Sequence, residues 1–455
     1  MTQRGKISFF GAAQGVTGSN HIFEVGGLRM MVDCGLFQGA HVGADENREQ
    51  FPYKPSEIDV LFVTHAHIDH IGRIPKLVRE GFSGIIYSTV PTLELAEVML
   101  MDTVRILGHE AKENDLEPIY VETDVTRAME LWKGIAYHES VPLAPQISAL
   151  LLDAGHILGS AMVVFTVGEK KLLFSGDLGN SPAPLLRDTE EIKNVAYVVM
   201  ESTYGDRNHK GREERKESLR KIIVDAVLRG GTLVVPAFSL ERTQELLFEL
   251  NEFVENKEVP PLTVFVDSPL AIKATEVYKH HEDFFNKETM DIIQSGDDIF
   301  RFPRLRFTET KDESMQIWDT HGPKMVMAGS GMANGGRIVH HLKHYIGDPS
   351  NTILFVGYQA VGTTGRQILE GAKSVRLFGT DVNVHAQVKT LQGYSAHKDS
   401  EHLLDFIASD ADSIQKVFLV HGELKSSLFL AQRMKDYIGI EAVVPGPGET
   451  VELEF

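Results

Sequence analysis

The stretch Thr64-His-Ala-His-Ile-Asp-His-Ile-Gly72 decides how the rest of this chain can be interpreted. It begins at the end of the apolar, β-branched run 59–64, which predicts a buried strand. Open α/β folds place their functional sites at the C-terminal ends of such strands. The stretch carries four candidate metal ligands, which are His65, His67, Asp69 and His70.

Three imidazoles and one carboxylate suit Zn²⁺ or a similar divalent ion. Side chains at alternate positions of a short loop point to different sides, so these four residues cannot all bind one metal. The spacing therefore indicates two metals. The alternative is a polar loop with satisfied histidines, which explains a lone histidine better than it explains this cluster.

The composition is that of a globular protein. The chain has 455 residues, of which 42% are hydrophobic and 24% charged, enough for two domains or for one domain with a large insertion. Cys34 is the single cysteine, which excludes an internal disulfide and fits a reducing compartment. No stretch has the length of a membrane span or the pattern of a secretory signal, so we expect a soluble, cytoplasmic protein with no membrane partner.

The net charge of −19 argues, taken alone, against a general polyanion binder. Bound divalent ions would offset several of these charges where a substrate approaches. Basic residues also cluster locally in 301–306, which is weak support for a nucleic-acid surface.

Further candidate ligands follow predicted strands as the first cluster does. The strands expected at 28–33, 149–153, 171–174, 196–200 and 417–420 each end at or before a polar group. A common cleft is the simplest interpretation. The residues placed this way are Asp33, His156, Asp177, Glu201 and His421.

These residues can be divided between two metals. The two expected ligand sets are His65, His67 and His156 for one zinc, and Asp69, His70 and His421 for the other. Asp177 can bridge them. A metal pair about 3.5 to 4 Å apart suits hydrolysis at phosphorus, because it stabilises the charge that develops on the phosphoryl oxygens.

Hydrolysis also needs a proton for the departing oxygen. Glu201 and His397 are the candidates, with the carboxylate orienting and charging the imidazole. The alternative is that they form a structural pair. Asp33 is expected to orient a ligand histidine or the attacking water rather than to bind metal directly.

From Asp206 onward, predicted strands alternate with helices of about 10 to 15 residues, which indicates a doubly wound parallel sheet. The loops 236–239, 267–269 and 329–332 lie at C-terminal strand ends, where a substrate would be held. Arg366 closes a glycine-rich turn that could cradle phosphate, although ordinary turn formation explains it equally well. The histidine pairs 280/281 and 340/341 are interpreted as helix surface residues.

Taken together, these residues resemble the metallo-β-lactamase superfamily, whose H-x-H-x-D-H loop matches residues 65–70. The remaining pattern is similar to its β-CASP branch, the nucleases of RNA processing and DNA repair. Glu201 matches the first acidic motif of the branch, His397 the second motif and His421 the third. Histidine at the third motif goes with RNA substrates in this branch.

The resemblance implies an α/β fold, a metallo-β-lactamase αββα sandwich with an inserted doubly wound parallel-sheet β-CASP domain. The expected parts are residues 1–205, the β-CASP domain 206–378 and the C-terminal part 379–455. The insert is expected to cap the zinc cleft and to admit a single strand. The resemblance also implies two Zn²⁺ per chain, a catalytic role for Asp69 and a homodimer. The residues expected to contact phosphate are Ser395, Ser330 and Gly331, besides Arg366.

The leading hypothesis is a two-zinc ribonuclease that hydrolyses single-stranded RNA and leaves a 5′-phosphate and a 3′-hydroxyl. A small-molecule zinc hydrolase shares the first loop, but it does not explain the insert or His397. A non-catalytic RNA-binding subunit is the third hypothesis; members of that kind lose zinc ligands, and this chain keeps them.

Overall fold

The computed structural model describes residues 3–38, 45–209, 211–357, 359–360, 362–391 and 393–455. The chain divides into two compact units. The first is Met1–Asn208 together with Ala396–Phe455, and the second is His209–Ser395. The second unit is therefore an insertion in the first.

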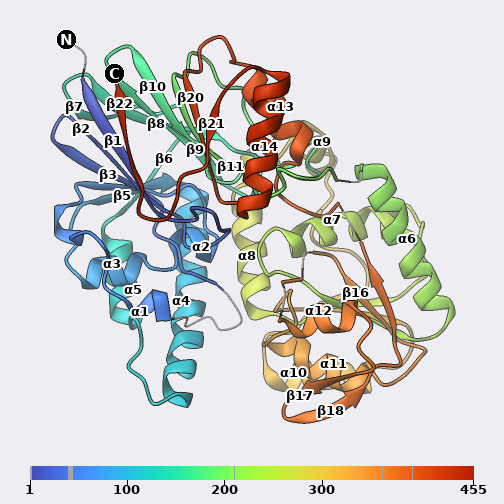
Figure 1. The fold of residues 1–455 in the computed structure, drawn as a ribbon. Helices are drawn as coiled ribbons and strands as arrows, with labels where there is room; N and C mark the ends of the chain where they lie inside the picture. Colours follow the sequence, from blue (N-terminus) through green and yellow to red (C-terminus); the bar gives the residue numbers. More distant parts are fainter. Residues whose placement is uncertain (1–2, 39–44, 210, 358, 361, 392) are drawn as a thin grey trace. The chain divides into compact units, whose positions relative to one another are not determined.

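The first unit contains two seven-stranded sheets (Figure 1). One sheet has the order β22 (Thr450–Glu454), β1 (Arg4–Gly11), β2 (Asn20–Val25), β3 (Leu28–Val32), β4 (Val60–Phe62), β5 (Ile85–Thr89) and β6 (Trp132–Ile135). The other has the order β21 (Ala442–Val443), β20 (Lys416–Val420), β11 (Tyr197–Glu201), β10 (Lys170–Phe174), β9 (Ala161–Val167), β8 (Ile147–Asp153) and β7 (Val141–Ala144).

Strand β9 explains why the two sheets pack face to face. Val163 and Phe165 point into a core shared by both sheets, where Phe165 meets Phe62 with ring centroids 5.3 Å apart. Met162 and Val164 point the other way, into a core shared with the C-terminal helices. Because successive side chains of a strand face opposite sides, an unbroken apolar run lets one strand contribute to two cores.

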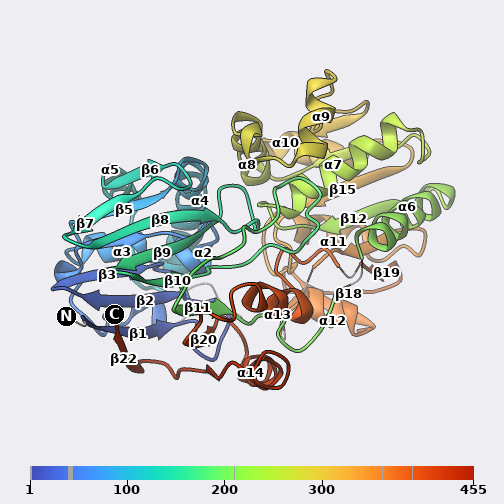
Figure 2. The ribbon, with the colours of Figure 1, turned by 90° about the horizontal axis from the view of Figure 1, so that it is seen from above.

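Helices cover the outer face of each sheet (Figure 2). Helices α3 (Ile74–Arg79), α4 (Val90–Glu113) and α5 (Glu122–Glu130) lie on the side of β5 and β6. Helices α13 (Ser400–Ala408) and α14 (Leu424–Tyr437) lie over β20 and β21. The predicted αββα sandwich is therefore confirmed. Two short helices, α1 (Asp45–Arg48) and α2 (Ile68–Ile71), precede α3.

The inserted unit is built on a six-stranded parallel sheet. Its order is β14 (Leu305–Phe307), β13 (Thr263–Val266), β15 (Lys324–Ala328), β12 (Thr232–Pro236), β16 (Thr352–Phe355) and β19 (Gln387–Thr390). The first strand, β12, is central. The chain next forms β13 and the edge strand β14, returns to place β15 between β13 and β12, and then adds β16 and β19 on the other side, which confirms the doubly wound arrangement. Its helices are α6 (Arg212–Leu228), α7 (Arg242–Glu255), α8 (Pro269–His280), α9 (Lys287–Gln294), α10 (Lys311–Asp319), α11 (Arg337–Tyr345) and α12 (Thr364–Leu369).

The end of the insert lies further along the chain than residue 378. The hairpin of β17 (Ser374–Leu377) and β18 (Thr380–Asn383) is followed by β19, which pairs in parallel with β16. This pairing adds residues up to Ser395 to the inserted unit. The edge strand is short and polar, so its sequence alone does not reveal which sheet it joins.

The interpretation of the histidine pair 340/341 as surface residues is wrong for His341. Its side chain is fully buried, and its Nε2 lies 2.7 Å from Asp267 Oδ2. Asp267 also accepts hydrogen bonds from Arg337 and Ser314, at 2.6 Å each. This carboxylate thus joins helices α10 and α11 to the end of β13.

Candidate metal centre

The candidate ligands follow strands of both sheets of the first unit, and three of the site residues lie at the ends of adjacent strands. Strands β10, β11 and β20 run parallel, with Phe174 opposite Val199 and Glu201 opposite Val420. The residues that follow these strands therefore emerge at one edge of the sheet. Asp177, Glu201 and His421 come together in this way.

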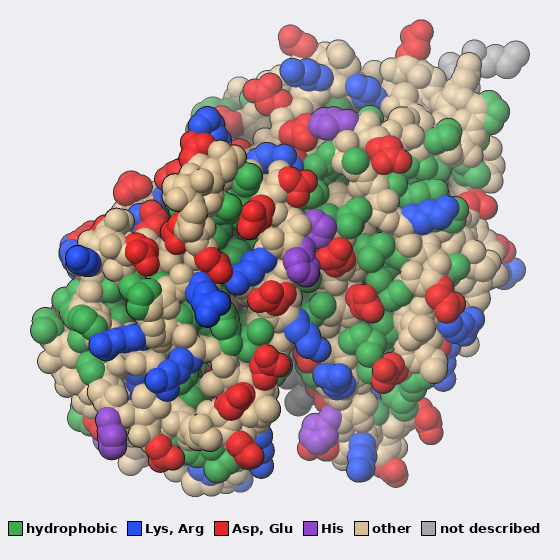
Figure 3. All heavy atoms as spheres, turned by 180° about the vertical axis from the view of Figure 1, so that it is seen from behind, with side chains coloured by type: hydrophobic (Ala, Val, Ile, Leu, Met, Phe, Trp, Pro, Cys, Tyr) green, Lys and Arg blue, Asp and Glu red, His purple; other side chains and the backbone are tan. Residues whose placement is uncertain are grey.

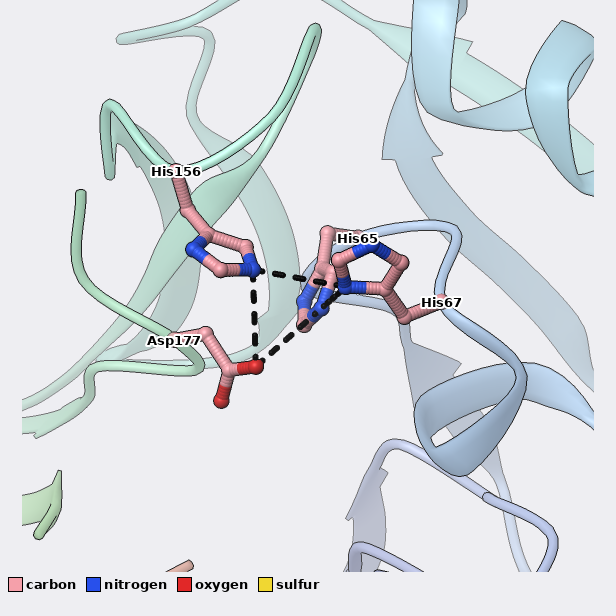
Figure 4. A group of neighbouring side chains, drawn as sticks. All are labelled: His65, His67, His156 and Asp177. Atoms are coloured by element: carbon pink, nitrogen blue, oxygen red, sulfur yellow. Dashed lines mark hydrogen bonds and ion pairs between the residues drawn. The ribbon is translucent and has the colours of Figure 1, made fainter. Parts of the chain in front are cut away.

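The first ligand group consists of His65, His67, His156 and Asp177 (Figure 4). The Nδ1 atom of His67 lies 3.0 Å from His65 Nε2 and 3.3 Å from His156 Nε2. Asp177 Oδ2 lies 3.4 Å from His65 Nε2 and 3.6 Å from His156 Nε2. One donor atom from each residue therefore lies within 4.8 Å of the others, and their binding of a metal stays a prediction.

The second group consists of Asp69, His70 and His421. His421 Nε2 lies 3.8 Å from Asp69 Oδ2 and 3.6 Å from Asp177 Oδ1. His70 Nε2 lies 3.4 Å from Asp177 Oδ2. Asp177 thus stands between the two groups and contacts both, which is the position of a bridging carboxylate.

The chemistry of these atoms fits a pair of divalent cations. Burial lowers the pKa of His67 to about 4 and, together with His70, holds the pKa of His65 well below its usual range. Neutral imidazoles have a lone pair to offer a metal. His70 Nε2 and Asp177 Oδ1 are buried and make no hydrogen bond within the described residues. Buried polar atoms need a partner, and a cation between the groups would provide one.

Asp33 lies beside His70, and its orienting role stays a prediction. Its Oδ2 lies 2.7 Å from His70 Nδ1, and its Oδ1 accepts a hydrogen bond of 2.9 Å from the Thr64 backbone N–H. A carboxylate at Nδ1 favours a proton on that nitrogen and leaves Nε2 free to face Asp177. Asp33 contacts a ligand histidine and is absent from the groups whose donor atoms converge.

Glu201 and His397 form a third group of converging side chains together with Asp177. His397 Nδ1 lies 3.0 Å from Glu201 Oε2 and 3.9 Å from Asp177 Oδ2. Burial acts to lower the pKa of His397, but Glu201 and Asp177 outweigh it and raise the pKa to about 9. These carboxylates therefore favour the charged imidazole, which is the form that can donate a proton.

The expected phosphate contacts all lie in the inserted unit. Ser330 and Gly331 follow β15, and Ser395 is the last residue of the unit. Arg366 lies in α12, where its Nε donates to Glu370 Oε1 at 2.7 Å. Their contact with substrate stays a prediction.

Sequence reasoning missed two residues beside the centre. The Thr64 hydroxyl donates to Asp33 Oδ2 at 2.9 Å and lies 3.1 Å from His65 Nδ1. The Tyr204 ring lies 6.0 Å from the ring of His397. Thr64 directly precedes His65, and Tyr204 lies three residues after Glu201. Their closeness in sequence to predicted site residues is the signal that could have identified them.

Comparison with known protein families agrees with this geometry. Residues 22–200 match the metallo-beta-lactamase superfamily domain, and residues 243–368 match the Beta-Casp domain. Residues 381–445 match a Zn-dependent metallo-hydrolase RNA specificity domain.

Individual relatives match over nearly the whole chain. Ribonuclease TTHA0252 from Thermus thermophilus is 37% identical, covering 94% of this chain and 95% of the relative. Transcription termination factor FttA from Methanocaldococcus jannaschii is 30% identical, covering 97% of this chain and 70% of the factor. A crystal structure of an Enterococcus faecalis protein of unknown function covers 99% of the chain with a TM-score of 0.57 at 13% identity, which supports the fold alone.

A metallo-β-lactamase domain interrupted by a β-CASP insert defines a class of hydrolytic nucleases, and this chain has both parts. The chain belongs to the β-CASP family of the metallo-β-lactamase superfamily, and it is an enzyme. No described helix is long and apolar enough to cross a membrane.

Proposed function

We propose that this protein is a two-zinc ribonuclease that hydrolyses single-stranded RNA and leaves a 5′-phosphate and a 3′-hydroxyl. The observation that carries the proposal is the position of His397, whose imidazole pairs with Glu201 and lies 3.9 Å from the carboxylate of Asp177. A general acid beside a two-metal site suits a reaction with a poor leaving group, such as a ribose oxygen.

The metals are assigned from the donor atoms. His65, His67 and His156 would hold one Zn²⁺, Asp69, His70 and His421 would hold the other, and Asp177 would contact both. When bound, the pair would neutralise charge on the phosphoryl oxygens and lower the pKa of a water molecule.

The residues of the chain supply the rest of the reaction. The attacking oxygen forms a bond to phosphorus while the bond from phosphorus to the 3′-oxygen breaks, and His397 donates its proton to that departing oxygen. Glu201 keeps the imidazole charged and oriented, and a backbone hydrogen bond of 2.6 Å from Leu178 N fixes the carboxylate. Asp69, beside the metals, would orient the attacking water.

RNA as the substrate is supported by the relatives and by the match of residues 381–445 to an RNA specificity domain. That segment contains His397 and His421. Acidic and basic side chains are interspersed over the face in Figure 3, so an overall charge of −19 leaves local cationic groups for phosphate. We propose that Arg366 is one such cationic contact and that Ser395, Ser330 and Gly331 contact phosphate as neutral groups. We also propose that the protein acts in the cytoplasm as a homodimer.

The test uses zinc-loaded protein and one sequence made as single-stranded RNA and as DNA, each with blocked and unblocked 5′ ends. We expect RNA cleavage to 5′-phosphate products and loss of that cleavage in His397→Ala. Full cleavage by His397→Ala would overturn the assigned acid. A small-molecule hydrolase would instead cleave ester or lactam substrates and spare RNA. Less than one zinc per chain, with RNA binding retained, would indicate a non-catalytic subunit.

A further inference from the structure

The chain returns from the inserted unit to the first unit immediately before His397, and the residue at this return, Tyr394, is unusually constrained. Tyr394 is 1% exposed. Its hydroxyl donates a hydrogen bond to Glu249 Oε2 on helix α7. Two guanidinium groups lie over its ring, with Arg215 Cζ 4.1 Å and Arg242 Cζ 5.4 Å from the ring centroid.

Arg215 extends this anchor to the backbone. It donates to Glu249 Oε1 at 2.9 Å and to the Gly393 carbonyl oxygen at 3.0 Å. Arg215 and Glu249 are 4% and 1% exposed. Burying such a pair carries a desolvation cost that apolar packing would avoid. The hydrogen-bonded network of Arg215, Glu249 and Tyr394 instead fixes the geometry of the segment at residues 393–394.

A second anchor begins two residues later, in the first unit. Asn180 N donates to the Ala396 carbonyl oxygen at 2.8 Å, and Lys398 N donates to the Leu178 carbonyl oxygen at 2.8 Å. His397 lies between these two bonds. The same strand end therefore holds the backbone of His397 and, through Leu178 N, the carboxylate of Glu201.

Little chain separates the two anchors. Only Ser395 and Ala396 stand between Tyr394 and His397, so the two Cα atoms are at most about 11 Å apart. At the other crossover, seven residues lie between Glu201 and His209, the first residue of the inserted unit. A displacement of Tyr394 is therefore passed to His397 through only two intervening residues, whereas the longer segment before His209 separates Glu201 from the inserted unit.

We propose that Tyr394, held by Arg215 and Glu249, is a positioning residue that sets His397 for proton donation and couples it to the inserted unit. This inference rests on the proposed function of His397 as the general acid. Loosening the anchor moves the acid. It also reaches one metal ligand, because His156 Nδ1 lies 3.2 Å from the Ala396 carbonyl oxygen, so zinc content is measured for each variant and kcat is compared at equal zinc content. At equal zinc content, loss of the anchor lowers kcat for substrates that need a proton on the leaving oxygen.

The experiment compares Tyr394→Phe with Tyr278→Phe in zinc-loaded full-length protein. Tyr278 is a matched control, because it is equally buried and its hydroxyl also donates to a buried glutamate, Glu241, but it belongs to helix α8 and not to the segment that leads to His397. Each variant is assayed on single-stranded RNA and on bis(p-nitrophenyl) phosphate, whose p-nitrophenolate departs without a proton. His397→Ala is assayed in parallel.

We expect Tyr394→Phe to lower kcat on RNA about tenfold, a fraction of what a positioned acid contributes, and to leave kcat on the nitrophenyl ester within about twofold, a margin taken as unchanged. Tyr278→Phe should leave both unchanged. Hydrogen exchange, measured without metal, should rise across residues 395–399 in Tyr394→Phe and stay at the wild-type level there in Tyr278→Phe.

The following results test the positioning role of Tyr394 and separate it from the role of His397 as the acid. Equal loss on both substrates, or no loss on RNA, in Tyr394→Phe overturns the positioning role. If His397→Ala itself loses activity equally on both substrates, the proposed acid is wrong rather than its anchor alone. Should Tyr394→Phe fail to fold, Arg215→Lys, which keeps the charge beside Glu249 but shortens the reach to Gly393, is held to the same criteria.

Discussion

Glu201 and His397 are 196 positions apart in the chain, yet His397 Nδ1 donates to Glu201 Oε2 at 3.0 Å beside the candidate metal ligands. The two residues lie on either side of the inserted unit. The insertion therefore leaves the acid and its orienting carboxylate in one compact unit together with the ligands.

Removal of this pair should affect catalysis and not metal binding. We expect His397→Ala to lower single-turnover RNA cleavage by about 10² to 10⁴-fold, the range of a positioned general acid, and Glu201→Gln to lower it less. His402→Ala is the control, since His402 also pairs with a carboxylate, Asp399, at 2.8 Å but is partly exposed. Equal losses in the His402 variant would show that the effect is not specific to the site.

Asp33 should act on metal affinity through His70. The neutral amide of Asp33→Asn supports the His70 imidazole less well than a carboxylate, so we expect zinc affinity to fall by about 10 to 100-fold. Competition with a chromophoric chelator measures this change. Asp59→Asn serves as the comparison, because Asp59 is exposed and accepts a bond only from the Arg29 backbone within the described contacts. Unchanged affinity in Asp33→Asn would contradict the orienting role.

The position of Asp177 predicts how zinc stoichiometry responds to substitution. Asp177 lies 3.4 Å from both His65 Nε2 and His70 Nε2, so Asp177→Asn should weaken both metals. His67 belongs to the first group alone, so His67→Ala should reduce the content from two zinc ions toward one. Elemental analysis after dialysis counts the metals. One zinc in the wild-type protein would rule out the two-metal assignment.

Glu241 should make stability depend on pH. Burial, with the nearby carboxylate of Glu245, raises the pKa of Glu241 from 4.5 to about 8. Between these values the folded chain binds a proton that the unfolded chain lacks, so the free energy of unfolding falls as pH rises from about 5 to 8. Glu241→Gln should remove much of this slope in urea unfolding at several pH values. A slope equal to that of the wild type would show that other groups cause it.

Much of the candidate site could be predicted because its residues follow a repeated local rule. His156, Asp177 and His421 each follow an apolar strand, and parallel strands bring their C-terminal ends to one edge. The loop that carries His65 to His70 needs no long-range information to be recognised as a ligand cluster. The sequence pattern could therefore nominate the ligands before any sheet order was known.

Other features depended on packing that no local pattern reveals. His341 looked like a surface residue, but helix α11 turns it toward Asp267. Strand β19 is short and polar, and only its pairing with β16 assigns it to the inserted unit. Tyr394 carried no motif, and its importance comes from three buried partners on two helices.

The sequence by itself determined the chemistry of this protein, since the type and spacing of His65, His67, Asp69 and His70 specify nitrogen and oxygen donors on one short loop. Only the tertiary structure decided how those donors are shared. Parallel pairing aligns the ends of β10, β11 and β20, and the loop after β4, a strand of the other sheet, brings His65 and His70 within 3.4 Å of Asp177. Contacts between residues hundreds of positions apart depend on the order of strands in a sheet, and that order follows from burying whole faces, which no single stretch of sequence encodes.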